Sequence, residues 1–86
     1  MSEEELIEIG RLTHIFSKIS VAVIDLKLPL SKGDRILIKG PTTDFEQNVE
    51  SLQIDRKEVA RVEAGQSAGL KLTKPAKEKD VVYKKL

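Results

Sequence analysis

Side chains that could carry out catalysis are scarce in this chain of 86 residues. It holds one histidine and no cysteine, which excludes a thiolate nucleophile and a cysteine-ligated zinc site. A Ser-His-Asp triad would have to combine His14 with Ser17 or Ser20 and with Asp25. A single histidine among surface-type residues is more often found at the end of a strand, and the acidic residues lack the spacing of metal ligands. We therefore predict no catalytic residue, no metal site and no enzymatic activity.

Nucleotide chemistry is excluded on the same kind of evidence. The chain contains no Gly-x-x-x-x-Gly-Lys-Ser/Thr sequence, which P-loop proteins need as a backbone cradle for phosphates and a hydroxyl for Mg²⁺. We predict that the protein neither hydrolyses GTP nor binds a cofactor.

Charge is abundant but balanced. Lys and Arg number 15 against 14 Asp and Glu, for a formal net charge of +1, so overall charge does not indicate nucleic-acid binding. The glutamates gather near the start of the chain and the lysines near its end, and such lysines usually form a solvated surface that protects strand edges. The start is acidic rather than basic and apolar, and no apolar run approaches the ~20 residues of a membrane span. We predict a cytoplasmic protein that does not contact membranes.

The elements that would position any site are expected to be strands. Short β-branched runs separated by turn residues recur along the chain. They cover residues 7–16, 19–26, 31–40, 45–54, 67–73 and 81–86. One connector, from Arg56 to Val62, could hold a single helical turn. We predict an all-β fold, a small six-stranded antiparallel β-barrel that forms one domain over residues 1–86, because closure would remove exposed strand edges.

Alternation along these runs predicts which side chains point into the core. The predicted core residues are Val21, Val23, Ile36, Ile38, Leu52, Ile54, Leu70 and Leu72.

Three pieces of the chain, taken in order, resemble the second domain of elongation factor Tu and related translational GTPases. They are LSKGDRILIKG, VESLQIDRKEV and EAGQSAGLKL, and the resemblance covers roughly Leu30 to Val82. It implies a β-barrel binding module. In that family the matching strand helps to form the pocket for the aminoacylated 3′ end of tRNA.

The resemblance implies a set of RNA-contacting residues. Arg56 and Lys57 match the basic pair of the family's strand, whereas Gln53 replaces its glutamate. Ser67 stands where the family has an asparagine, and Lys71 where it has an aliphatic residue. These departures argue against discrimination of an aminoacyl group.

Two functions are open from the sequence. The first is contact with RNA or the translation apparatus, with phosphates bound by Arg56, Lys57 and Lys71, helped by Arg35 and Lys39, and polar contacts made by Gln53 and Ser67. The second is a protein-interaction module or a detached accessory domain of a larger enzyme, such as a collagenase-type peptidase. A bland interpretation is equally open, in which the basic pair is only a solvated turn.

Overall fold

The computed structural model describes residues 5–85. Its strands are β1 (Leu6–Phe16), β2 (Val21–Leu26), β3 (Leu30–Ser31), β4 (Arg35–Lys39), β5 (Asp44–Asn48), β6 (Leu52–Ile54), β7 (Lys57–Val59), β8 (Arg61–Val62), β9 (Ser67–Lys71) and β10 (Val81–Lys85). Every strand pairing is antiparallel. The all-β antiparallel prediction is confirmed.

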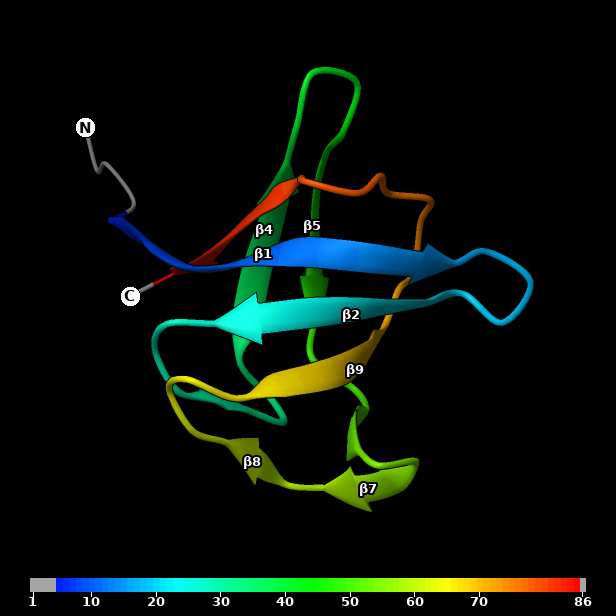
Figure 1. Cartoon of the computed structure of the whole chain (residues 1–86). Helices are drawn as coiled ribbons and strands as arrows, with labels where there is room; N and C mark the ends of the chain where they lie inside the picture. Colours follow the sequence, from blue (N-terminus) through cyan, green and yellow to red (C-terminus); the bar gives the residue numbers. More distant parts are fainter. Residues whose placement is uncertain (1–4, 86) are drawn as a thin grey trace.

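Most strands belong to one curled sheet. Eight of the strands in the described part of the chain pair in the order β5-β4-β10-β1-β2-β9-β6-β7, and β3 pairs with β8 in a second, two-stranded sheet. Figure 1 shows β4 and β5 crossing behind β1 and β2, so the sheet bends back over itself. The pairings of residues 5–85 do not close into the predicted ring of six strands, since β5 and β7 remain the two ends of the order.

A buried side chain spans the gap beside β5. Gln47 is 3% exposed, and its Nε2 donates a hydrogen bond of 2.7 Å to the carbonyl oxygen of Lys71 on β9. Its Oε1 accepts from the backbone nitrogen of Thr73 at 2.9 Å. An amide side chain thus presents the donor and acceptor that a neighbouring strand would supply.

Strand β1 runs through the middle of the sheet and carries two irregularities. Its register shifts between Glu8 and Gly10 against β10, and between Leu12 and His14 against β2. Such bulges bend a strand and increase its twist. A Cβ at Gly10 would lie 2.4 Å from the carbonyl oxygen of Asp25, so this close approach of β1 and β2 requires glycine. The bent strand can therefore pair with β10 along one edge and with β2 along the other.

The core lies inside the curl. Its fully buried larger side chains include Ile9, Leu12, Ile24, Leu30, Ile36, Ile38, Leu52 and Leu70. Of the predicted core residues, Ile36, Ile38, Leu52, Leu70 and Leu72 are buried.

The predicted face of β2 is wrong. Ala22 and Ile24 point into the core, whereas Val21 and Val23 are half-buried on the outer face. Both faces of this strand carry apolar residues, so alternation alone did not distinguish them. Ile54 is also only half-buried. The connector between Arg56 and Val62 forms the short strands β7 and β8 in place of a helical turn.

Candidate functional site

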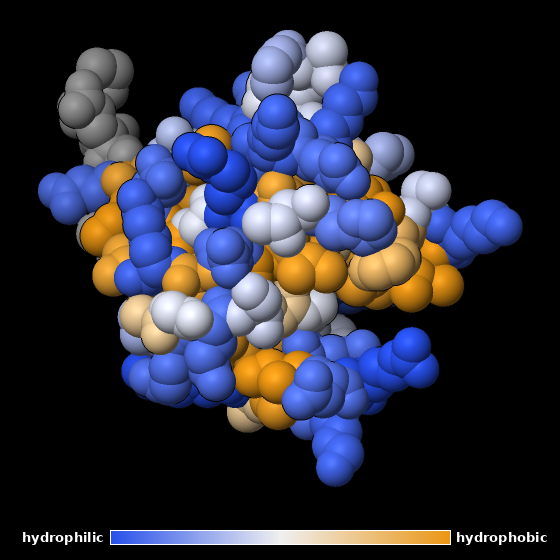
Figure 2. Space-filling model, viewed as in Figure 1, coloured by the Kyte–Doolittle hydropathy of each residue, from blue (hydrophilic) through white to orange (hydrophobic). Residues whose placement is uncertain are grey.

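A hollow with a volume of about 710 Å³ lies on the surface, bordered by the half-buried side chains of Val21 and Val23 on β2 and Ile54 on β6. It opens between the β1–β2 turn and the β6–β7 hairpin, and Figure 2 shows the notch on the right, beneath a hydrophobic projection. The lining is apolar at Phe16, Ile19, Val21, Val23 and Ile54, small at Ala68 and Gly69, and polar at Gln53, Asp55, Arg56 and Ser67.

The apolar wall of the hollow includes the most exposed large hydrophobic side chains. Ile19 is 59% exposed and Phe16 is 46% exposed. Phe16 is the last residue of β1, and Ile19 lies within the turn of residues 17–20 that joins β1 to β2. Ser20 in the same turn has a φ of +55°. Two large apolar side chains held at a turn beside a concave surface are typical of a contact surface.

The opposite rim is the two-residue turn between β6 and β7. Ile54 pairs with Lys57, so Asp55 and Arg56 form the turn, with φ of +51° and +65°. Two successive positive φ values are those of a type I′ turn, whose second position is usually glycine. Among residues 5–85, Arg56 has neither a hydrogen bond from its side chain nor an ion pair. Its guanidinium is therefore available to a ligand.

The other polar groups around the hollow are partly engaged. Ser67 Oγ donates a hydrogen bond of 2.6 Å to Asp25 Oδ1. Lys71 Nζ donates one of 3.1 Å to the carbonyl oxygen of Ile19, which ties β9 to the β1–β2 turn. Gln53 is exposed on the face of β6 that borders the hollow. The structure thus brings Gln53, Arg56 and Ser67 together around one surface, with Lys71 at its edge.

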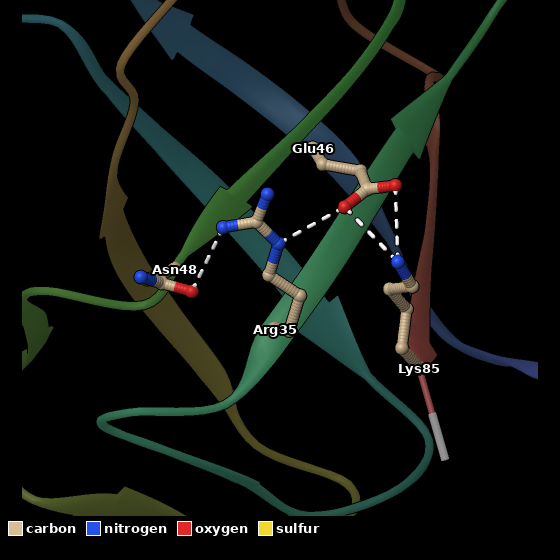
Figure 3. A network of polar contacts seen from close by, with 4 residues as sticks. All are labelled: Arg35, Glu46, Asn48 and Lys85. Atoms are coloured by element: carbon tan, nitrogen blue, oxygen red, sulfur yellow. Dashed lines mark hydrogen bonds and ion pairs between the residues drawn. The ribbon is translucent and has the colours of Figure 1, made fainter.

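Three further predicted residues lie outside the lining of the hollow. Lys57 is exposed at the start of β7, where it pairs with Ile54. Arg35 belongs to a polar network on β4, β5 and β10 that Figure 3 shows: its Nε donates to Glu46 Oε2 at 3.0 Å and its Nη1 to Asn48 Oδ1 at 3.1 Å. Lys85 Nζ lies 3.2 Å from both carboxylate oxygens of Glu46. The hydrogen bond from Arg35, and then that from Lys85, lower the pKa of Glu46. Lys39 is exposed at the other end of β4, and neither residue lines the hollow.

The hypothetical triad is not assembled. His14 Nδ1 lies 3.5 Å from Glu78 Oε2, and its ring packs edge-on against Phe16 with centroids 4.5 Å apart. Asp25 accepts its hydrogen bond from Ser67, so the histidine and the aspartate proposed for a triad each have another partner. Residues 5–85 hold no group of three or more His, Cys, Asp or Glu side chains arranged to bind a metal. Nor does this part of the chain contain a helix long and apolar enough to cross a membrane.

Three apolar residues of the hollow, Val21, Val23 and Ile54, were missed as surface residues because they were assigned to the core. The run ISVAVIDL is apolar on both strand faces, which signals that the outer face is covered or used as well as the inner one.

Comparison with known proteins gives two kinds of likeness. The chain matches no protein-family model. It is 43% identical over 83 residues to an uncharacterized protease of Methanocaldococcus jannaschii. The match includes 95% of this chain but only 20% of the relative, so the chain spans about one fifth of that protein.

The fold is that of a solved domain. The C-terminal domain of a Geobacillus thermoleovorans protein described as a U32 peptidase superposes with a TM-score of 0.82, at 18% identity, over 88% of this chain and 89% of that domain. Its selenomethionine variant gives the same TM-score over 96% of that chain. The chain therefore has the fold of this peptidase C-terminal domain.

These findings correct the assignment to the second domain of elongation factor Tu. The similar proteins are a protease and a domain of a U32 peptidase, and the translation-factor and RNA-binding interpretation is wrong. A Lys-Gly-Asp turn and a Gly-flanked strand recur wherever short antiparallel strands are joined by tight turns, so the three quoted pieces reflect shared β-architecture.

Proposed function

We propose that the chain is a non-catalytic accessory domain of a U32-type peptidase, which associates with a larger catalytic polypeptide. The observation that carries the proposal is the extent of the sequence match. Nearly the whole chain, 95% of it, corresponds to 20% of the M. jannaschii protease at 43% identity. A match of domain length inside a longer protease is what an accessory unit predicts.

The character of the surface agrees with this role. The hollow exposes apolar side chains that a binding partner would cover, whereas the side chains with potential chemistry are engaged in structural contacts. An accessory domain needs a recognition surface and no nucleophile.

A segment exchange tests the proposal. The 83 residues of the M. jannaschii protease that match this chain are replaced by this chain, and the chimera is compared with the parent protein and with a protein lacking the segment. We expect the chimera to recover the parent's sedimentation behaviour, thermal unfolding and hydrolysis of a labelled casein.

Two results would overturn the proposal. One is a chimera indistinguishable from the deletion protein in sedimentation and unfolding. The other is hydrolysis of casein by the isolated 86-residue chain, because a non-catalytic domain cannot cleave a peptide bond.

A further inference from the structure

The floor of the hollow is formed by a glycine that the fold does not require. A Cβ on Gly69 would lie 3.5 Å from Val21 Cγ1 and 3.7 Å from Gln53 Cβ, which are ordinary contacts. Its φ is not among the positive values. Each other glycine of the chain has either a positive φ or a contact that excludes a Cβ, namely Gly10, Gly33, Gly40 and Gly65.

Glycine at this position destabilises the strand, and the fold does not require it. In the interior of a strand glycine is less favourable than alanine, because it loses more conformational entropy on folding. Strand glycines that packing does not explain mark places where a ligand or another backbone approaches closely. The bare position lies in the middle of β9, directly on the lining of the hollow.

The strand ladder also ends at this position. Within the described residues, β6 pairs with β9 through Leu52↔Leu70 and Gln53↔Gly69. Beyond Gln53, β6 leads into its hairpin with β7, while β9 on the other side of Gly69 continues along β2 through Ala68 and Ser67. The edge of β9 that faces the hollow is therefore open to an added strand or peptide backbone.

We propose that the hollow binds an extended peptide segment that places an apolar side chain over Gly69 and a carboxylate beside Arg56. The apolar contact is provided by Val21, Val23 and Ile54, and the guanidinium supplies charge complementarity. The left-handed backbone at Arg56 holds that side chain at the rim, and strained residues of this kind gather at binding sites. The carboxylate of Asp55 on the same turn repels a peptide carboxylate placed next to it. The peptide is therefore expected to bind in one orientation, with its carboxylate beside Arg56. That the partner is a polypeptide follows from the proposed function, and the inference rests on that proposal.

The test titrates three peptides into the ¹⁵N-labelled chain: acetyl-Val-Leu-Glu-Val-amide and its Gln and Lys counterparts. We expect amide shifts at the hollow and an affinity about tenfold higher for the Glu peptide than for the Gln peptide, the ratio that one charge-assisted hydrogen bond supplies. Arg56→Gly should remove this preference. Arg11→Gln is the matched control, because Arg11 is exposed on β1 outside the hollow.

Gly69→Ala adds only a Cβ, which would lie at ordinary contact distance from its neighbours, and Gly69→Val adds two further methyl groups at the lining of the hollow. We expect Gly69→Val to abolish binding of every peptide while its urea unfolding curve keeps the parent's slope. Gly69→Ala should weaken binding and leave the fold intact. This variant therefore still tests the role of Gly69 in binding if the larger side chain of Gly69→Val perturbs the strand.

Equal binding by the Gly69→Val protein, shifts confined to another surface, or no binding to the parent chain would overturn the inference. So would a concentration-dependent dimer that Gly69→Val abolishes, since the occupant would then be a second copy of the chain. Peptide binding together with a failed chimera would refute only the proposed function. A working chimera with no peptide binding would refute only the assignment of the hollow.

Discussion

The side-chain amide of Gln47 and the backbone of Lys71 join two strands that are not neighbours in the sheet. The donor Nε2 lies 2.7 Å from the carbonyl oxygen of Lys71, and Oε1 also accepts from the Thr73 backbone nitrogen at 2.9 Å and from its hydroxyl at 3.3 Å. No buried side-chain polar atom of the described residues lacks a hydrogen-bond partner. One glutamine thus fastens β5 to the far end of β9, where the curled sheet has no backbone ladder.

Replacement of Gln47 by Ala should destabilise the fold strongly. The substitution removes a buried side chain and leaves the Lys71 carbonyl and the Thr73 N–H without their partners in a partly buried place, and we expect a loss of about 2–4 kcal/mol in the free energy of unfolding. Urea unfolding measures the loss. Gln53→Ala is the control, because Gln53 is exposed and should change stability by less than about 0.5 kcal/mol. Equal effects of the two substitutions would refute the bridging role.

The two faces of β2 should respond differently to truncation. Ile24→Ala removes a fully buried side chain and is expected to cost about 2–5 kcal/mol. Val23→Ala removes an outer, half-buried side chain and should cost under about 1 kcal/mol. Denaturant melts of the two proteins check the assignment, and a larger loss for Val23→Ala would mean that the strand lies the other way round.

The fold was predictable from the sequence where charged residues mark one face of a strand. Arg35 and Lys39 mark the outer face of β4, and Ile36 and Ile38 lie in the core as predicted, although Leu37 on the outer face is buried too. Prediction failed where both faces are apolar, as on β2 at Val23. The local pattern there does not say which face points inward, because the face is chosen by the neighbouring strands.

The candidate site residues were chosen through the resemblance to the second domain of elongation factor Tu. Gln53 and Ser67 lie on one surface in the structure because their strands, β6 and β9, pair directly. Arg35 was added for its charge alone, and charge does not say which end of a sheet a strand occupies. Its partner Glu46 lies on the adjacent strand β5, a contact that only the register reveals.

The stability of the fold should fall in acid through Glu46. Hydrogen bonds from Arg35 and then Lys85 lower the folded-state pKa of this carboxyl. A carboxyl whose pKa is lower in the folded state stabilises the fold at pH values above its pKa in the unfolded state, ~4.3 for glutamate. This stabilisation is lost as the pH falls through the pKa of the folded state. Glu46→Gln should therefore flatten the decline in urea midpoint between about pH 7 and about pH 2.5.

Two comparisons sharpen this measurement. Some acid sensitivity should persist in Glu46→Gln, because a hydrogen bond from Lys32 lowers the pKa of Glu58 in the same direction. Glu50→Gln is the control, since Glu50 is exposed and has no ion pair within residues 5–85. If Glu50→Gln flattens the profile as much as Glu46→Gln does, the network is not the cause.

Arg56→Gly should raise stability. A glycine adopts the φ of +65° found at this position without the steric cost of a Cβ, and we expect a gain of about 0.5–1 kcal/mol. Lys57→Gly, one residue on and within β7, is the matched control and should lose about the same amount. Thermal and urea unfolding report both values. A loss in Arg56→Gly would show that the arginine side chain stabilises the hairpin.

The pairing of β1 with β10 sets the order in which this protein can form. These strands come from opposite ends of the described chain and lie side by side in the middle of the sheet. Loop closure over such a sequence separation slows folding, since the entropy is lost before the contact forms. During synthesis the central ladder must therefore wait for the last strand to emerge, and until then β1 offers one unpaired edge to any other strand within reach.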